Sequence, residues 1–384
     1  MFSGCEALEA DLSKWLEGKN NATNLEGMLL GCRNFNANIS GWNVSKVKSL
    51  KNLLSECIQF NQNLVEWNVE NVEDMSYCFR ACGNYNQPMD KWKVSKAVTL
   101  RGMFQHATKF EQNLKAWKDY IGNVTDMAEM FLGAKAYTGQ GLEYWNVARV
   151  TDFSNMFSGA EKFVGNLSSW DVSRGRLFNG MFSNCRRFAA DLTGWNPSEA
   201  ENTSQMFNNC AAFYSDLKDW RMPRLLNMSG MFKWCTTYIA DLSDWDVSQV
   251  RDFSAAFKGC QAFVSDLSRW NVGSGEDFSE MFASCSKFVS DLSKWDVAEA
   301  KKMDRMFNDA SIFTSDLSNW DVSKVTDMKK MFDGAAMFNS DVTKWNVAKV
   351  KNMTGIFNGA KQFNCSLASW NLKGLSEEKT ITLS

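Results

Sequence analysis

The cysteines are the first residues in this chain that could carry chemistry, because eleven of them could form disulfides or hold a metal ion. Nine recur ten residues before a tryptophan: Cys5, Cys32, Cys57, Cys82, Cys185, Cys210, Cys235, Cys260 and Cys285. Elsewhere the same position is alanine, as at Ala107 and Ala310. A position that accepts Cys or Ala selects a small apolar side chain, so we expect a row of buried thiols. Disulfides and a metal site are the alternatives, although no C-x-x-C pair exists and His106 is the single histidine.

Acidic residues form a second regular set, four residues before successive tryptophans. Its members are Asp191, Asp216, Asp241, Asp266, Asp291, Asp316 and Asp341. Asparagine takes the same place earlier in the chain, at Asn38 and Asn63. Because both side chains can accept a backbone N–H, the exchange predicts Asx-type turns. A calcium ladder is the alternative, since stacked carboxylates could share cations.

Catalysis is not indicated. The chain has one histidine and lacks G-x-S-x-G, H-E-x-x-H and a Gly-rich phosphate loop. We therefore expect a protein that is not an enzyme and that has no cofactor.

The charges and the hydropathy also exclude some classes of partner. Lys and Arg number 42 against 44 Asp and Glu, without long runs of one sign, which argues against a nucleic-acid partner. No stretch approaches eighteen consecutive apolar residues, so no membrane span is expected in this chain.

A tryptophan repeat positions all of these residues. Twelve of the fourteen intervals in the series are 25 residues, and the other two are 27 and 28. The series is Trp15, Trp42, Trp67, Trp92, Trp117, Trp145, Trp170, Trp195, Trp220, Trp245, Trp270, Trp295, Trp320, Trp345 and Trp370. A fixed period of this length is typical of a solenoid, whose units bury their apolar faces by stacking on each other.

Each unit is predicted to contain a strand and a helix. The spacing Leu292-x-x-Trp295-x-Val297 matches a leucine-rich-repeat strand. Val325, Met328, Met331 and Phe332 have helical spacing, after a possible N-cap at Ser323. The predicted fold is thus α/β, a leucine-rich-repeat-like solenoid of about fifteen strand-turn-helix units.

The domain organisation follows from the extent of the repeat. Residues 1–372 are predicted to form a single repeat solenoid, and residues 373–384 a C-terminal cap or linker. Pro88 and Pro197 replace regular repeat residues and should weaken strand pairing locally.

The repeat as a whole carries a resemblance. The pattern M-F-x-x-C/A-x-x-F-x-x-D-L-x-x-W-D/N-V-S-x-V, from Met1 to about Leu372, resembles the BspA-type leucine-rich-repeat surface protein family in its 25-residue form. This resemblance implies bacterial or protist surface proteins used in adhesion and protein binding, with no common catalytic residue.

The residue directly after each tryptophan is the predicted partner-binding position. It lies between an inward Trp and an inward Val, so it should face outward on the strand sheet. A merely solvated sheet face is the alternative. The candidates are Asn43, Asn68, Asn146, Asp171, Asp246, Asn271, Asp296, Asp321 and Asn346.

Two insertions offer candidate glycosylation sites. The sequons at Asn21 and Asn123 lie in the insertions Leu16–Asn24 and Lys118–Asn123, at the same place in the repeat. Both should project from one rim, where solenoids often acquire specificity.

The predicted function is non-catalytic protein binding or adhesion at the cell surface or after secretion. The alternative is a structural scaffold subunit of a larger assembly, so the partner is another protein or a second copy of this chain. Met1-Phe2-Ser3-Gly4-Cys5 matches the repeat's own M-F-x-x-C segment, which predicts that the chain lacks its true N-terminus.

Overall fold

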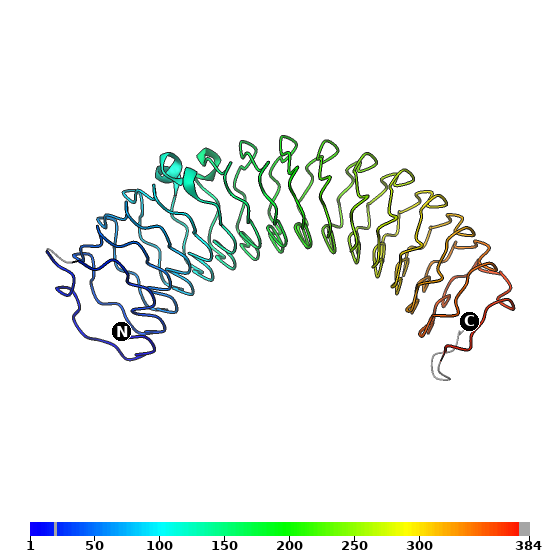
Figure 1. The fold of residues 1–384 in the computed structure, drawn as a ribbon, viewed down its shortest axis with the longest axis horizontal. Coiled ribbons are helices and arrows are strands. Elements are labelled where there is room, and N and C mark those ends of the chain that lie inside the picture. The colour runs from blue at the N-terminus through cyan, green and yellow to red at the C-terminus, as the bar shows by residue number, and fades with distance from the viewer. Residues whose placement is uncertain (19–20, 376–384) are drawn as a thin grey trace. The chain divides into compact units, whose positions relative to one another are not determined.

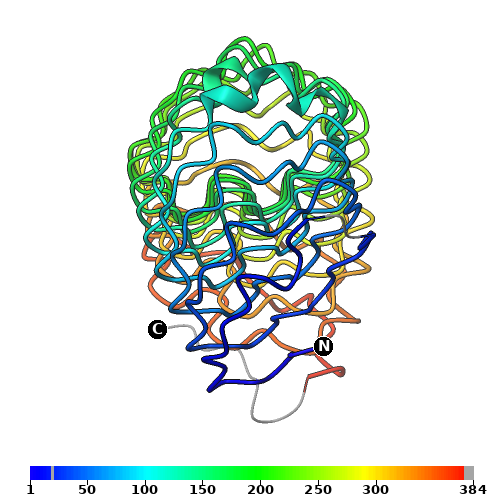
Figure 2. The same cartoon turned by 90° about the vertical axis from the view of Figure 1, so that its left-hand side faces the viewer.

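The computed structural model describes residues 1–18 and 21–375. It contains two compact units, Met1–Trp195 (unit 1) and Asn196–Ser384 (unit 2). Within each unit the chain winds into similar coils that stack one on the next, with about one coil for each tryptophan interval (Figure 1). The coils of unit 1, seen nearly along the stack, superpose as similar loops (Figure 2).

Adjacent coils are joined by parallel β-bridges at a residue that follows the tryptophan by seven positions, or by nine after Trp15 and Trp117. In unit 1 these bridges run from Asn24 to Leu177, and in unit 2 from Asn202 to Asn352. From the bridge onward, every second N–H donates to the next coil: Phe278 N to Lys302 O at 3.0 Å, then Glu280 N to Asp304 O at 2.8 Å. We call this bonded part of each coil the ladder segment.

The intervening N–H groups of the ladder segment close tight turns inside the coil. Met281 N donates to Phe278 O at 3.2 Å, and Ala283 N donates to Glu280 O at 3.0 Å. These successive turns require a left-handed residue at every fourth position, as at Glu280 (φ 58°) and Ser284 (φ 60°). Glycine adopts this conformation without steric cost, whereas any other residue loses about 1 kcal/mol or more there.

The secondary structure differs from the prediction. The segment around Trp295 is a turn, in which Trp295 N donates to Leu292 O at 3.1 Å, and the part of each coil predicted as a helix is the ladder segment. Over the described residues there is no α-helix and no strand longer than a bridge. The physical reason is that turns repeating every four residues place apolar side chains at the same three- and four-residue spacings as a helix does.

The helices that do occur are short 3₁₀ helices in the coil with the 28-residue interval. They are η1 (Lys115–Asp119), η2 (Ile121–Asn123) and η3 (Leu142–Tyr144). They lie on the edge of unit 1 opposite the ladder segments (Figure 1). Pro88 does not interrupt the ladder. Asp74 precedes it in sequence and Thr99 follows it, and these two residues still form their β-bridge.

The core consists of aromatic side chains stacked from coil to coil. Trp295 is 3% exposed and stacks on Trp270 and on Trp320, with ring centroids 6.5 Å apart in both cases. Its indole Nε1 donates to Leu267 O at 2.9 Å, a bond to the preceding coil that recurs along the tryptophan series. Phe282 packs on Phe288 at 4.0 Å. Each coil thus buries its aromatic face only against its neighbours, as the repeat predicts.

The described part of the chain ends within the predicted C-terminal cap or linker. Leu375 N donates to Leu372 O at 3.1 Å, and residues 376–384 lie outside the described residues.

Candidate protein-interaction surface

The cysteine row is part of the core. Eight of the nine repeat cysteines are buried, and all eleven cysteines are free thiols. Each buried Sγ of the row typically donates to a backbone carbonyl of the preceding coil, as Cys285 Sγ does to Phe257 O at 3.0 Å. Burial raises the pKa of the Cys235 thiol to about 12, so it stays protonated and unreactive at neutral pH. The expected buried thiol row is confirmed except at Cys5, which is exposed in the first coil.

The acidic row closes turns, as the exchange of Asp for Asn predicted. Asp241 Oδ1 accepts the N–H of Ser243 at 2.9 Å, and Asp266 and Asp291 accept in the same way. This N–H bond, with that of the Ser243 side chain, lowers the pKa of the Asp241 carboxyl. The carboxylates are therefore charged at neutral pH, and they are exposed. No group of three His, Cys, Asp or Glu side chains that could hold a metal ion occurs within residues 1–18 and 21–375.

A buried serine of the following coil fixes four of the carboxylates in unit 2, namely Asp241, Asp266, Asp291 and Asp316. Ser265 Oγ accepts the N–H of Leu242 at 2.8 Å and donates to Asp241 Oδ1 at 3.5 Å. Ser290 does the same for Leu267 and Asp266, with its bond to the carboxylate at 3.2 Å. The acidic row is therefore held in place by contacts within and between coils.

The nine predicted partner-binding residues lie on the surface, but in turns and not on a sheet. Eight are exposed and Asn43 is half-buried. Where the bond is described, the side chain accepts the N–H two residues later, as Asp321 Oδ1 does from Ser323 at 2.9 Å. In unit 2 the row is continuous over five coils, whereas in unit 1 Lys93 and Lys118 interrupt it. Partner binding by these residues stays a prediction.

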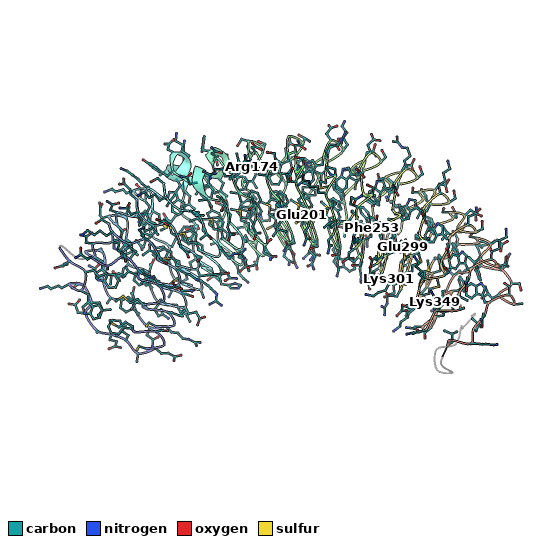
Figure 3. All side chains as sticks on the ribbon, in the orientation of Figure 1. Arg174, Glu201, Phe253, Glu299, Lys301 and Lys349 are labelled. Atoms are coloured by element: carbon teal, nitrogen blue, oxygen red, sulfur yellow. The ribbon has the colours of Figure 1, made fainter. Side chains whose placement is uncertain are left out.

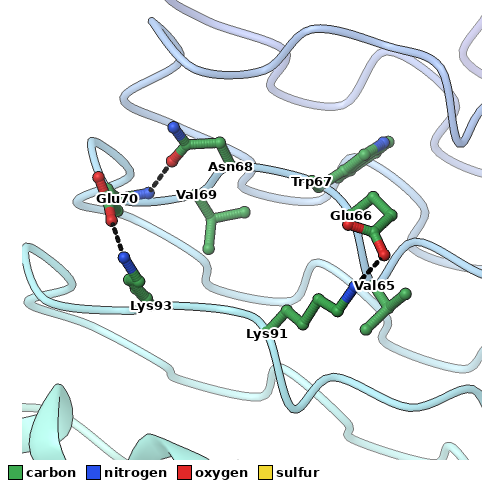
Figure 4. A pocket seen from close by; sticks show the side chains of 8 residues that line it. All are labelled: Val65, Glu66, Trp67, Asn68, Val69, Glu70, Lys91 and Lys93. Atoms are coloured by element: carbon green, nitrogen blue, oxygen red, sulfur yellow. Dashed lines mark hydrogen bonds and ion pairs between the residues drawn. The ribbon is translucent and has the colours of Figure 1, made fainter.

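Where Lys93 interrupts the row that follows the tryptophans, the surface of unit 1 has a shallow groove of about 210 Å³ (Figure 4). Two ion pairs bridge the coils there: Lys93 Nζ lies 2.9 Å from Glu70 Oε1, and Lys91 pairs with Glu66. Asn68 Oδ1 is occupied by the N–H of Glu70. The polar groups of this groove are thus largely engaged with each other.

A different row of unit 2 is apolar and exposed, and the sequence analysis did not identify it. It stands six residues before the tryptophan in four consecutive coils, and we call it the apolar row. Its members are Tyr214 (67% exposed), Ile239 (67%), Val264 (52%) and Val289 (54%). In early coils of unit 1 the same repeat position holds polar Asn36, Asn61 and Asn86, whereas Val164, later in unit 1, is 50% exposed.

Alternation along the chain places the apolar row beside the acidic row. Over residues 263–267 buried and exposed side chains strictly alternate: Phe263, Ser265 and Leu267 are buried, while Val264 and Asp266 are exposed. In such an extended stretch, residues two apart project to the same side. Each coil of this region therefore presents one apolar side chain and one carboxylate together.

A groove of about 580 Å³ lies between two of these coils in unit 2. Val264 and Val289 line it together with Asp266, Asp291 and Lys294. Arg269 also borders the groove, but its guanidinium pairs with Asp244 at 2.8 Å. The local surface thus combines exposed apolar side chains with a row of fixed negative charges.

The alternation is the signal that could have revealed this surface from the sequence. The segment Phe263-Val-Ser-Asp-Leu267 alternates apolar and polar types except at Val264, where early coils of unit 1 have asparagine, as at Asn61. An apolar residue in an outward position stands out only when equivalent positions are compared across repeats.

Other exposed charges pair between neighbouring coils. Lys324 Nζ lies 2.5 Å from Glu299 Oε1, and Lys301 pairs with Glu276. Glu299 and Lys301 are labelled among the side chains in Figure 3. Pairs of this kind leave these positions close to neutral.

The two candidate glycosylation sites differ in their contacts. Asn123 is exposed, but its Nδ2 donates to Ser95 O at 2.8 Å and its Oδ1 accepts from Arg149 at 2.9 Å. Asn21 Oδ1 accepts from Lys46 Nζ at 2.7 Å. Modification of Asn123 requires its amide to leave Ser95, so Asn21 is the more accessible of the two.

Comparison with known protein families identifies the repeat. The model of the family described as "Mycoplasma protein of unknown function, DUF285" matches residues 1–117, 120–220, 204–317 and 290–382. The chain belongs to this family. No significant relative was found among curated proteins.

Similar solved structures are leucine-rich-repeat proteins at low identity. A Bacteroides ovatus leucine-rich-repeat protein is 12% identical, with a TM-score of 0.36, over 83% of this chain and 75% of its own. A leucine-rich cell surface protein from Faecalibacterium prausnitzii is 11% identical, with a TM-score of 0.33, over 84% of this chain and 76% of its own.

A third similar structure is a complex of TLR13 with single-stranded RNA. It is 12% identical, with a TM-score of 0.28, over 88% of this chain and 48% of its own, so the match spans about half of that protein. Likenesses this distant say nothing about what the present chain binds.

The described residues include no helix that is long and apolar enough to cross a membrane.

Proposed function

We propose that this chain is a non-catalytic repeat protein that binds other proteins, and that it does so at the cell surface or after secretion. The observation that carries the proposal is the apolar row of unit 2. Four large apolar side chains are exposed there in consecutive coils, although the same position is polar in the first coils of unit 1. Contiguous exposed apolar surface on an otherwise polar protein marks an interaction site.

The repeat architecture supports binding over catalysis. Solenoids present extended surfaces on which several coils contribute one side chain each. Most residues that could do chemistry have structural tasks here: nine of the eleven thiols are buried, and the acidic row closes turns. The likeness of the repeat to BspA-type surface proteins makes adhesion the form of binding that we propose.

Selection of peptides from a random phage-display library against the immobilised full chain tests this function. A parallel selection uses Ile239→Asn/Val264→Asn, which places in unit 2 the residue that three coils of unit 1 carry at this position, at Asn36, Asn61 and Asn86. We expect binders that bind the wild-type chain and lose affinity for the variant. If no peptide is enriched on either chain, or if enrichment is unaffected by the variant, binding through this surface is wrong.

The scaffold alternative has a separate readout. If the apolar row contacts a second copy of the chain, sedimentation of the wild-type protein will show concentration-dependent association that the same variant abolishes.

A further inference from the structure

We propose that the partner of unit 2 is a basic amphipathic α-helix that lies along the apolar row, with its Lys or Arg side chains facing the acidic row. This inference rests on the proposed function and specifies the chemistry of the partner. It follows from the spacing of the coils, the charge beside the apolar row, and the groove between Val264 and Val289.

Next to the apolar row the step from coil to coil is closer to the pitch of a helix than to the repeat of a strand, although the step widens to 6.5 Å between Trp270 and Trp295. The aromatic residues that directly precede the apolar row are 5.5 Å apart from Phe213 to Tyr238 and 5.9 Å apart from Phe263 to Phe288. A helix repeats every ~5.4 Å, while alternate residues of a strand repeat every ~6.6 Å. Over three steps a helix therefore drifts from the apolar row by about 1 Å and a strand by nearly 3 Å.

A helix that contacts four coils needs apolar residues at about i, i+4, i+7 and i+11, which form one stripe on its surface. The recognition would resemble the packing of an amphipathic helix into a hydrophobic groove. The groove beside Val264 and Val289 offers about 580 Å³ for its central side chains.

The acidic row determines the sign of the charges on the partner. Asp216, Asp241, Asp266 and Asp291 are exposed, each two residues beyond a member of the apolar row. Their turn hydrogen bonds keep these carboxylates in fixed positions. Lys218 pairs with Asp216 at 3.8 Å, Arg269 pairs with Asp244 at 2.8 Å, and Lys294 lines the groove. The negative charge at the edge of the apolar row therefore comes from Asp241, Asp266 and Asp291. Complementary charges raise the association rate and exclude acidic partners.

The test uses two labelled peptides of about 18 residues, long enough to form a helix. Both carry four leucines with the stripe spacing above; one has Lys beside the stripe and the other has Glu. Their affinity for the full chain is measured by fluorescence anisotropy at low and high salt. We expect the Lys peptide to bind at least tenfold more tightly than the Glu peptide, with an affinity that falls as salt rises.

Two variants separate the apolar from the electrostatic contribution. Ile239→Asn/Val264→Asn should weaken the Lys peptide by at least tenfold, since each apolar side chain then loses its burial. Asp241→Asn/Asp266→Asn should weaken it by about twofold to tenfold and reduce the salt dependence. Asparagine occupies both of these repeat positions in unit 1, so both variants are expected to fold, which circular dichroism verifies.

A matched control removes two exposed apolar residues elsewhere. Ile58→Asn/Val98→Asn alters unit 1 at other repeat positions and should leave the affinity unchanged. The inference is overturned if the two peptides bind equally, or if binding survives the Ile239→Asn/Val264→Asn exchange. If phage display still yields peptides that depend on the apolar row but are not basic, the proposed function stands and this inference alone is wrong.

Discussion

Replacement of Trp295 by phenylalanine tests how far the tryptophan stack stabilises its coils. Trp295 is 3% exposed, and its indole Nε1 donates to Leu267 O at 2.9 Å. Phenylalanine leaves that buried carbonyl without its partner, which costs about 1–3 kcal/mol. The smaller ring also leaves a void beside Trp270 and Trp320, which costs about 1 kcal/mol more. We therefore expect Trp295→Phe to lower the free energy of unfolding by about 2–4 kcal/mol.

Urea unfolding and hydrogen exchange together measure this effect. Because coils contact mainly their neighbours, faster exchange should appear in the coils around Trp295 and leave unit 1 unchanged. Trp15→Phe is the matched control, since Trp15 is 46% exposed and should cost less than about 1 kcal/mol. Equal losses from the two variants, or faster exchange throughout both units, would refute this reasoning.

The remaining predictions concern thiols, turns, buried hydroxyls and pH. A thiol reagent should label Cys5 and Cys365 rapidly in the native protein and the other nine cysteines only after unfolding, because those nine are buried; rapid labelling of most thiols would contradict the packing. Ala255→Gly should raise the free energy of unfolding by about 1 kcal/mol, since Ala255 has φ 52°, whereas a loss of similar size in a urea titration would indicate a helix at this place. Tyr238→Phe should leave stability unchanged or raise it by up to ~2 kcal/mol in the same assay, because the buried Tyr238 hydroxyl has no hydrogen-bond partner among the described residues; a clear loss would reveal such a partner. The turn hydrogen bonds of Asp241 lower the pKa of its carboxyl, so the stability that they provide is present above about pH 4 and is lost as the pH falls through the lowered pKa. In urea titrations at several pH values, Asp241→Asn should therefore make the free energy of unfolding depend less on pH in acid. An unchanged dependence on pH would contradict this.

The sequence predicted those features that depend on spacing alone. A period anchored at residues such as Trp295 implies coils that stack, whatever their backbone conformation. The exchange of Cys for Ala predicted a small buried position, and the exchange of Asp for Asn predicted a capped turn. Both follow from the chemistry of single side chains, which is why they could be predicted without a structure.

The backbone conformation was harder to predict, because successive turns and a helix share the same apolar spacing. The distinguishing signal is glycine at every fourth position, as at Gly27 and Gly31 or Gly355 and Gly359, all of which have positive φ. In other coils non-glycine residues such as Glu280 hold these positions, so the signal is interrupted. The apolar row was missed for a related reason: Val264 is an unremarkable residue until it is compared with Asn61 in the same repeat position.

The central claim is that unit 2 binds its partner along the apolar row. Hydrogen exchange of the full chain, with and without the saturating Lys-bearing peptide, tests it most directly. The account predicts slower exchange in the segments 239–244, 264–269 and 289–294, and no change at residues 36–63 of unit 1. Protection confined to the residues that follow the tryptophans, such as Asp246 and Asn271, or protection in unit 1 alone, would contradict it.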